Sequence, residues 1–332
     1  MPKNILLTGG CGFVGHHFID YILRVTDWTI TCLDRLTYAG DLNRLAVLPS
    51  WAKEGKRVEV LYHDFRSPLA DNNLDRVTKR KPDYIIHMGA ETHVGNSFSE
   101  PLTFASTNVI GTVQMLELAR KLQPERFLYV STDEVYGPVV PPALHAEGEP
   151  HRPSNPYSAS KSGAEAFCRA YNKSFGTPVL ITNTMNNYGE RQAREKFIPK
   201  VMRLVDMYLS VPLHCAKDEA GNVTDISSRC WLHARDHAAG ILFVLQRGIP
   251  GEQYNITGER ADVLSVAEMI ARFMGAPLYT EFVAFHQYSP GHDMHYGLDG
   301  SKLAALGWIP DFNLADSLEQ VVRWTMAHKE WL

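Results

Sequence analysis

The sequence TGGCGFVG at residues 8–15 follows a short apolar run at 4–8 and precedes an amphipathic stretch at 13–24. Gly9, Gly12 and Gly15 are spaced three apart, which suits a tight turn, a close approach of backbone to a ligand, and close packing of helix on strand. The first helical N–H groups and the positive end of the helix dipole favour an anion there. The stretch therefore predicts a strand, a diphosphate-binding turn and a helix.

Short β-branched runs continue to alternate with helical patterns beyond this turn. We expect strands at 4–8, 28–33, 58–62, 84–88, 127–130 and 179–182, and helices at 13–24, 102–122 and 157–175. Such alternation is typical of βαβ units with right-handed crossovers. The prediction is an α/β fold with a Rossmann-like, doubly wound parallel sheet.

The pattern changes after residue 185, where strands shorten and further helices are expected at 195–208, 234–246, 263–273 and 316–328. We therefore expect two domains: a dinucleotide-binding domain at 1–185, to which some later segments return, and a smaller, mostly C-terminal α/β substrate-binding domain at 186–332. The linking sequence is not rich in Ser or Gly.

The composition excludes several classes of protein. The chain has 332 residues, a net charge of −4 and 45% hydrophobic residues, which argues against a disordered chain and against a broad basic surface for nucleic acid. Its apolar runs are far shorter than the roughly 20 residues that cross a bilayer, and we expect neither a membrane span nor a signal peptide. Five scattered cysteines without a CxxC pair predict a reduced, cytoplasmic protein.

An acidic residue follows the second expected strand. Asp34 lies nineteen residues after Gly15, where a carboxylate can accept both ribose hydroxyls of an adenosine and would repel a 2′-phosphate. This spacing favours NAD over NADP, although the neighbouring Arg35 leaves NADP open. Asp64, which ends the third strand, is placed to reach the adenine amino group.

Tyr157 and Lys161 are four residues apart at the start of an expected helix, so their side chains share one face. The ordinary pKa of tyrosine is about 10. A nearby ammonium and a positive nicotinamide ring would both lower it and let the phenol act as a base.

The segment Ser131–Gly137, STDEVYG, adds two adjacent carboxylates, Asp133 and Glu134. Neighbours in a strand face opposite sides, so both can serve one pocket only where the strand has ended. If C4 of a hexose is a ketone, the C5 proton becomes acidic, and one group can remove it while an acid protonates the departing C6 hydroxyl.

These motifs, together with LDRLTYAGDL, HMGAETHVGNS, TNVIGT, PYSASK, NNYG, YNITG and PGHDMHYGLD, span nearly the whole chain. The sequence resembles the extended short-chain dehydrogenase/reductases that act on nucleotide sugars, in particular the dTDP-glucose 4,6-dehydratases. The resemblance implies a lyase of deoxysugar biosynthesis that recycles NAD, with a homodimer formed by the helices at 102–122 and 157–175.

The resemblance also implies roles for particular residues. Glu134 is the base at C5, Asp133 the acid at the C6 oxygen, and Tyr157, with Lys161, the base at the C4 hydroxyl, whose oxygen Thr132 binds. Implied cofactor contacts are Gly9, Gly12, Phe13, Val14, Gly15, Asp34, Arg35, Leu36, Thr37, Asp64, Phe65, Met88, Gly89, Ala90, Thr107, Tyr157 and Lys161. Implied substrate contacts are Thr92, Thr132, Asn186, Asn187, Lys196, Phe197, Arg229, Asn255 and His292. No metal site is expected, because His233 and His237 have no evident third ligand.

Three departures from the family pattern concern the nucleotide. Cys230 stands where the family usually has Asp, Ser289 where it usually has Arg, and the segment 212–229 is longer than usual. We expect dTDP-glucose first and UDP-glucose second. Open alternatives are a nucleotide-sugar 4-epimerase or decarboxylase, which would not need Asp133 and Glu134, and a non-catalytic NAD-binding regulator, which should have lost Tyr157, Lys161 or the carboxylates.

Overall fold

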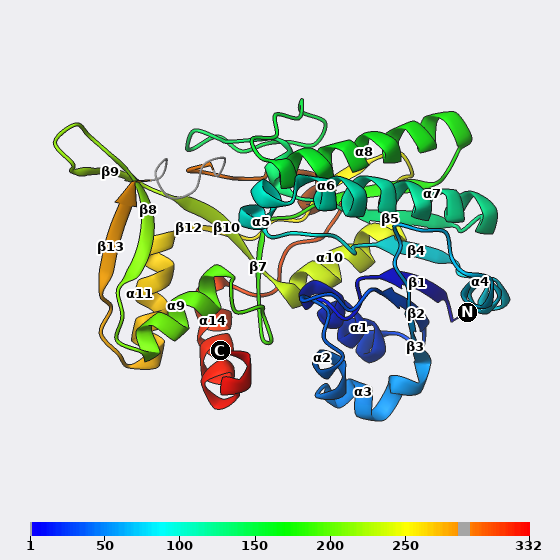
Figure 1. The fold of residues 1–332 in the computed structure, drawn as a ribbon, viewed down its shortest axis with the longest axis horizontal. Helices are drawn as coiled ribbons and strands as arrows, with labels where there is room; N and C mark the ends of the chain where they lie inside the picture. Colours follow the sequence, from blue (N-terminus) through cyan, green and yellow to red (C-terminus); the bar gives the residue numbers. More distant parts are fainter. Residues whose placement is uncertain (1, 285–292) are drawn as a thin grey trace.

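A seven-stranded sheet organises the chain in the computed structural model, which describes residues 2–284 and 293–332 (Figure 1). The strand order is β11-β6-β5-β4-β1-β2-β3, and every neighbouring pair is parallel. The strands are β1 (Asn4–Thr8), β2 (Thr29–Asp34), β3 (Val58–Tyr62), β4 (Tyr84–His87), β5 (Arg126–Val130), β6 (Val179–Asn183) and β11 (Gln253–Asn255). The doubly wound parallel sheet is confirmed, and β11 is a strand from the second half that the sequence patterns did not reveal.

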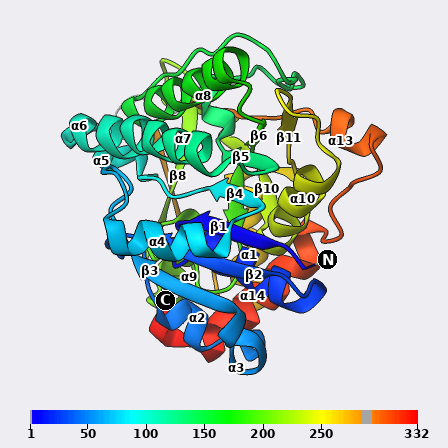
Figure 2. The same ribbon diagram turned by 90° about the vertical axis from the view of Figure 1, so that its right-hand side faces the viewer.

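Helices cover both faces of this sheet (Figure 2). One layer holds α4 (Asp71–Arg80), α7 (Gly111–Leu122) and α8 (Pro156–Phe175), and the other holds α1 (Phe13–Val25) and α10 (Ala234–Arg247). In α1 the buried residues Phe18, Ile19, Ile22 and Leu23 recur at helical spacing and join the core beneath the sheet. Because the two helical layers bury both faces of the sheet, its strands consist of nearly continuous runs of apolar residues.

The start of α8 is set by its local sequence. The Asn155 side chain accepts the Ser158 N–H at 2.8 Å, the Ser158 hydroxyl binds back to the Asn155 N–H at 3.1 Å, and Pro156 occupies the first turn. The helix ends at Gly176, whose φ of +66° suits a residue without a side chain. Because the N-terminus is fixed, Tyr157 and Lys161 sit in the first two turns, one above the other.

The second lobe contains two smaller sheets, at the left of Figure 1. The first is ordered β12-β10-β7 and the second β13-β8-β9. Their strands are β7 (Asn186–Tyr188), β8 (Val211–Lys217), β9 (Val223–Ile226), β10 (Ser228–His233), β12 (Glu259–Asp262) and β13 (Thr280–Ala284). The helices α9 (Phe197–Asp206), α11 (Val263–Met274) and α14 (Leu314–Ala327) pack with them around a separate apolar core.

The chain crosses between the two lobes more than once. β7 begins the second lobe at Asn186, whereas α10 packs on α1 and β11 joins the main sheet. The longer segment at 212–229 forms most of the antiparallel β8–β9 hairpin. The division into 1–185 and 186–332 stays a prediction, with α10 and β11 as the later segments that return.

The remaining elements connect these layers. They are α2 (Asn43–Ala46), α3 (Pro49–Glu54), η1 (Gly55–Arg57), α5 (Val94–Ser99), α6 (Pro101–Phe104), the π-helical turn η2 (Ala105–Ile110), η3 (Asp133–Val135), α13 (Ser301–Ala305) and η4 (Lys329–Trp331). Within the described residues, no helix combines the length and the apolar character needed to span a membrane.

Candidate active site

A cavity of about 370 Å³ opens at the carboxyl ends of the parallel strands, between the main sheet and the second lobe. This is where ligands bind in open α/β sheets. Its walls include most of the predicted cofactor residues: Gly9, Gly12, Phe13, Val14, Gly15, Asp34, Arg35, Thr37, Phe65, Met88, Gly89, Ala90 and Thr107. Thr92, Thr132, Asp133, Glu134, Tyr157, Lys161, Asn186, Asn187, Lys196 and Phe197 line the same cavity.

The glycine turn has no room for side chains. An ideal Cβ on Gly15 would lie 2.1 Å from the Gly9 carbonyl oxygen, and one on Gly9 would lie 2.8 Å from the Gly89 Cα. Gly9 also has a φ of +74°, which side chains disfavour. The turn therefore brings bare backbone to the N-terminus of α1, as the glycine spacing predicts.

Asp34 is held by the turn itself. Its Oδ2 accepts the Cys11 N–H at 2.9 Å and its Oδ1 accepts the Leu36 N–H at 2.8 Å. Arg35 lies between two carboxylates, 3.9 Å from Asp64 and 3.7 Å from Glu91. Its charge is therefore already offset, which weakens the case for a 2′-phosphate beside it.

Two predicted cofactor residues lie outside the cavity lining. Asp64 forms a bidentate ion pair with Arg66, with an Nη2–Oδ2 distance of 2.6 Å, and this hydrogen bonding lowers the pKa of the Asp64 carboxyl. Leu36 contributes its N–H to Asp34 but does not line the cavity. Their proposed contacts with a cofactor stay predictions.

The catalytic candidates follow the end of β5. Ser131 N–H donates to Thr182 O and Asp133 N–H to Thr184 O, both at 2.7 Å, which keeps this segment in register with the end of β6. The chain then turns into η3, so Asp133 and Glu134 line one cavity instead of facing opposite sides. The Thr132 hydroxyl donates to Asp133 Oδ1 at 3.1 Å.

Burial raises the pKa of both carboxyl groups. The pKa of Asp133 rises to about 7, because the group is desolvated and lies beside Glu134. The pKa of Glu134 is also raised by burial, but Asn155 Nδ2 donates to Glu134 Oε2 at 3.0 Å and opposes the shift. The unequal surroundings suit Asp133 as the acid of the pair.

Lys161 lies in the second turn of α8 and is buried. Its Nζ donates to Val130 O at 2.7 Å and lies 4.3 Å from the centre of the Tyr129 ring. Burial lowers the pKa of Lys161 to about 8.

The expected lowering of the Tyr157 pKa is not seen in the protein by itself. Burial, followed by the nearby Glu134 carboxylate, raises the pKa of Tyr157 well above its ordinary value. A hydrogen bond with Thr132 opposes this shift without cancelling it. The positive nicotinamide ring of a bound cofactor would lower the pKa of the phenol.

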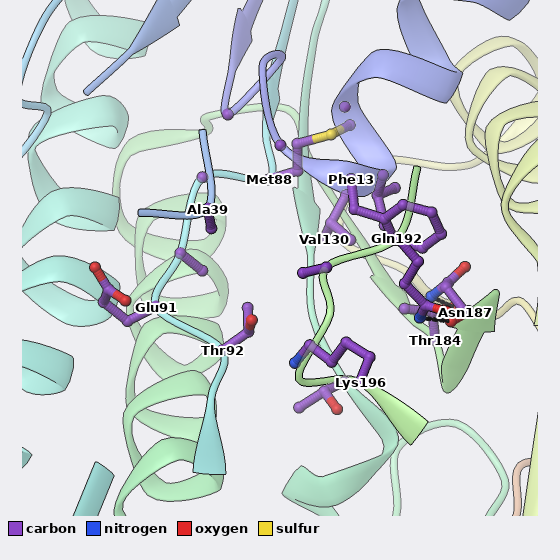
Figure 3. Close-up of a pocket in the computed structure, with 18 of the residues that line it drawn as sticks. Phe13, Ala39, Met88, Glu91, Thr92, Val130, Thr184, Asn187, Gln192 and Lys196 are labelled. Carbon is purple, nitrogen blue, oxygen red and sulfur yellow. Dashed lines mark hydrogen bonds between the residues drawn. The ribbon is translucent and has the colours of Figure 1, made fainter. Parts of the chain in front are cut away.

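The substrate candidates divide into two groups. Thr92, Asn187 and Lys196 project from different segments around one space in Figure 3. Arg229 does not line the cavity, because its guanidinium donates to the carbonyl oxygens of Ser228, Asp293 and Met294. Asn255, tied to His145 O and Asp299 O, is also outside the lining, and His292 and Ser289 lie outside the described residues.

The cavity also contains residues that sequence reasoning missed, among them Arg44, Glu91, Gln192, Trp231 and His237. Asn187 Oδ1 and Gln192 Oε1 are buried acceptors that have no partner within the described residues. His237 is fully buried with neither ring nitrogen paired there, and burial lowers its pKa to about 3. Unpaired buried polar atoms inside a cavity are the groups that a ligand or water satisfies.

The proposed absence of a metal site can be examined only in the described part of the chain. In that part, His233 and His237 belong to no group of three potential metal ligands. Among the described residues, Cys11, Cys32 and Asp34 form the one group of three whose potential ligand atoms all lie within 4.8 Å of one another. The Asp34 carboxylate oxygens already accept two backbone N–H groups.

Comparisons with known proteins agree with this geometry. The sequence profile of the GDP-mannose 4,6 dehydratase family matches residues 6–321. The chain is 33% identical to dTDP-glucose 4,6-dehydratase of Escherichia coli, with 99% of this chain and 95% of that protein covered, and 35% identical to its counterpart in Actinoplanes sp., with 99% of each covered.

Solved structures show the same relationship. The dTDP-glucose 4,6-dehydratase DesIV of Streptomyces venezuelae, solved with NAD bound, superposes with a TM-score of 0.86 at 34% identity and covers 99% of this chain and 98% of its own. The enzyme of Bacillus anthracis, in complex with NAD, gives 0.84 at 32% identity, with 99% and 98% covered. The chain therefore belongs to the GDP-mannose 4,6 dehydratase family.

Proposed function

We propose that the protein is an NAD-dependent nucleotide-sugar 4,6-dehydratase that converts dTDP-glucose to dTDP-4-keto-6-deoxyglucose. The observation that carries this proposal is the convergence of Asp133, Glu134, Tyr157 and Thr132 on one cavity with the glycine turn. An epimerase would need the glycine turn, Tyr157 and Lys161, but not two carboxylates with raised pKa values. A regulator would need none of these proton-transfer groups.

The residues present fit NAD. The side-chain-free turn at Gly9 and Gly15 admits a diphosphate, Asp34 presents a fixed carboxylate to a ribose, and Arg35 is offset by Asp64 and Glu91. Two of the relatives above were solved with NAD. When bound, NAD would supply the hydride acceptor for C4 and the hydride donor for C6, so it would be recycled rather than consumed.

The proton transfers are assigned to this chain's own side chains. Tyr157 removes the proton of the C4 hydroxyl, and Thr132 donates a hydrogen bond to the C4 oxygen. Glu134 removes the C5 proton once C4 is a ketone and returns a proton to C5 when C6 is reduced. Asp133 gives its proton to the C6 oxygen, which leaves as water, and a pKa of about 7 keeps this acid largely protonated below neutral pH.

Lys161 and Lys196 complete the charge distribution around the sugar. The Lys161 ammonium is anchored on Val130 O, one helical turn from Tyr157, where its charge favours the phenolate. Lys196 is partly buried and lines the same cavity, and we assign it to the substrate diphosphate.

The nucleotide assignment is supported by the names of the relatives, which are dTDP-glucose 4,6-dehydratases. Thymine and uracil present the same imide edge, and one methyl group in an apolar niche discriminates by roughly 10- to 200-fold. UDP-glucose is therefore the second candidate. GDP and CDP sugars should be poor substrates, since a purine needs more room and cytosine exchanges an acceptor for a donor.

We propose a homodimer formed by the continuous helix of α6, η2 and α7 together with α8. Large apolar side chains on these helices are exposed in the single chain: Leu102, Ile110, Phe167 and Phe175. An exposed apolar patch of this kind is typical of a protein interface. Sedimentation at micromolar concentration should give about twice the 37.3 kDa of one chain, whereas a stable monomer would contradict the proposal.

We also propose a cytoplasmic location. The five cysteines of the protein are buried and have free thiols, which suits a reducing compartment; they are Cys11, Cys32, Cys168, Cys215 and Cys230. Fractionation of the source cells, probed for this protein, tests the assignment.

Turnover of the four nucleotide glucoses tests the proposed function. The purified protein, with NAD in catalytic amount, should convert dTDP-glucose to a 4-keto-6-deoxy product with kcat/KM well above that for UDP-glucose, and NADH should not accumulate. Stoichiometric NADH would contradict the dehydratase chemistry. A preference for a GDP or CDP sugar would overturn only the nucleotide.

A further inference from the structure

A buried arginine stands beside the glycine turn without a carboxylate partner. Arg44, in α2, is 5% exposed and lines the cavity. Its guanidinium donates to three backbone carbonyl oxygens, Ala39 O at 2.6 Å, Arg191 O at 3.1 Å and Cys11 O at 3.3 Å. Within residues 2–284 and 293–332, no carboxylate lies within 4.0 Å of it. The carboxylates of Asp41, Glu195 and Asp34 favour the charge of Arg44 from a greater distance, but burial still lowers its pKa, so none of them fully replaces a direct counter-ion.

A second buried cation lies directly behind the first. Arg191 Nε donates to His16 Nε2 at 2.9 Å, and the other ring nitrogen of His16 lies 3.2 Å from Gly12 O. Because Nε2 accepts, the proton of His16 is on Nδ1 and the imidazole is neutral, and burial lowers the pKa of His16 well below its usual value. The imidazole therefore offsets none of the positive charge of Arg44 and Arg191.

Arg44 cannot swing away to solvent. The Trp331 ring of η4 lies 5.4 Å from the Arg44 guanidinium, and Ala39, Cys11 and Arg191 hold it through their carbonyl oxygens. Its Nη2 donates no hydrogen bond within the described residues, so this nitrogen is available to a ligand.

The position of Arg44 connects two parts of the expected cofactor site. Cys11 lies in the glycine turn, its N–H donates to Asp34, and its carbonyl oxygen accepts from Arg44. Cys11 therefore links the Arg44 guanidinium to the Asp34 carboxylate, and the guanidinium lies beside the glycine turn that leads into α1. An anion placed there meets both the helix terminus and a planar array of N–H donors, which suits phosphate oxygens.

We propose that Arg44 is a further cofactor-binding residue, whose positive charge is neutralised by the diphosphate of the bound dinucleotide. The inference rests on the proposed function, because it takes NAD as the ligand. An ion pair with Arg44 would add to the hydrogen bonds of the glycine turn. It would help to retain a cofactor that must stay bound through the reaction cycle. Arg191 adds to the positive potential from behind without touching the cavity.

Calorimetric titration with fragments of the cofactor tests the proposal. Adenosine, ADP and 2′-AMP are bound to the parent protein and to Arg44→Met, which keeps an apolar stem against Trp331. The measured quantity is the ratio of the Kd values for ADP and adenosine, because a general disturbance of the loops would weaken both. We expect Arg44→Met to reduce the preference for ADP by about 10- to 100-fold, and Arg44→Lys to recover part of it.

Arg57 provides the matched control. Its guanidinium also donates to three carbonyl oxygens, those of Leu23, Thr26 and Trp28, but it does not line the cavity. Arg57→Met should leave the ratio unchanged. An unchanged ratio in Arg44→Met would overturn the inference, as would a selective loss of 2′-AMP, which would place the charge at the ribose. If the parent protein binds neither ADP nor NAD, the proposed function itself fails.

Discussion

The two ends of the cavity use opposite chemistry. At the cofactor end, the groups are backbone N–H donors, the Asp34 carboxylate and the Arg44 guanidinium, all arranged to meet a charged ligand. At the catalytic end, burial raises the pKa values of Asp133, Glu134 and Tyr157, which are the side chains proposed to exchange protons with the substrate. Binding and proton transfer therefore depend on separate groups, and mutations should separate them.

The sharpest test of that separation is Tyr157→Phe. Removing the phenol should lower kcat by about 10²–10⁴-fold, the usual contribution of a general base, because Tyr157 is the group assigned to take the C4 proton. Binding of ADP should not change. Tyr188→Phe is the control, since its hydroxyl is also buried, with Ser317 at 2.5 Å, but remote from the proposed chemistry. Equal loss of ADP binding and kcat in Tyr157→Phe would contradict the comparison.

The carboxylates should affect a later step than Tyr157. In Glu134→Gln and Asp133→Asn, we expect elimination to slow by about 10²–10⁴-fold while oxidation at C4 continues, so absorbance of NADH should build up transiently in a stopped-flow experiment. Asp20→Asn serves as the control, because this carboxylate is buried but binds Ser50 and Arg24 away from the cavity. Parent-like turnover in either active-site variant would remove its assigned role.

Gly15→Ala should weaken cofactor binding and leave the catalytic side chains in place. The new Cβ would lie 2.1 Å from Gly9 O, so the turn must move, and we expect the Kd for NAD to rise by about 10- to 100-fold, as when one or two hydrogen bonds to a charged group are lost. With saturating NAD, kcat should recover. Gly163→Ala in α8 is the control, since its Cβ would meet Val109 at an ordinary 3.4 Å. An unchanged Kd for NAD in Gly15→Ala would show that the turn does not need bare backbone.

The smallest effect is the pH dependence of elimination. The Asp133 pKa is raised to about 7, so the acid is protonated below that pH and loses its proton above it. We expect kcat/KM to be constant below about pH 7 and to fall above pH 7, with a loss that approaches tenfold per pH unit. The residual activity of Asp133→Asn should not show this fall. If the fall persists in this variant, it reports the titration of another group.

The cofactor end could be read from the chain because its chemistry is local. The glycine spacing and the distance to Asp34 each act within about twenty residues, and each appears in the structure. Most expected strands and helices agree to within two residues for the same reason, since hydrophobic period and capping are local properties.

The residues that sequence reasoning missed depend on contacts between distant segments. Arg44 meets Cys11, Arg191 and the ring of Trp331, and no spacing along the chain predicts that meeting. His237 lines the cavity because α10 returns to pack on α1. Arg229 fits a phosphate by its chemistry, yet the carbonyl oxygens of Asp293 and Met294 take up its donors.

By itself, the sequence determined the doubly wound sheet and the side-chain-free turn, because hydrophobic period and glycine spacing are written in the chain, and its resemblance to the family supplied the candidate proton-transfer residues. Only the tertiary structure decided their ionisation. The lowered pKa of Tyr157 is predicted beside a bound nicotinamide, whereas in the chain alone burial and Glu134 raise it, and burial beside Glu134 brings the pKa of Asp133 to about 7. Desolvation and the approach of charges from other segments set a pKa, and both exist only once the chain has folded.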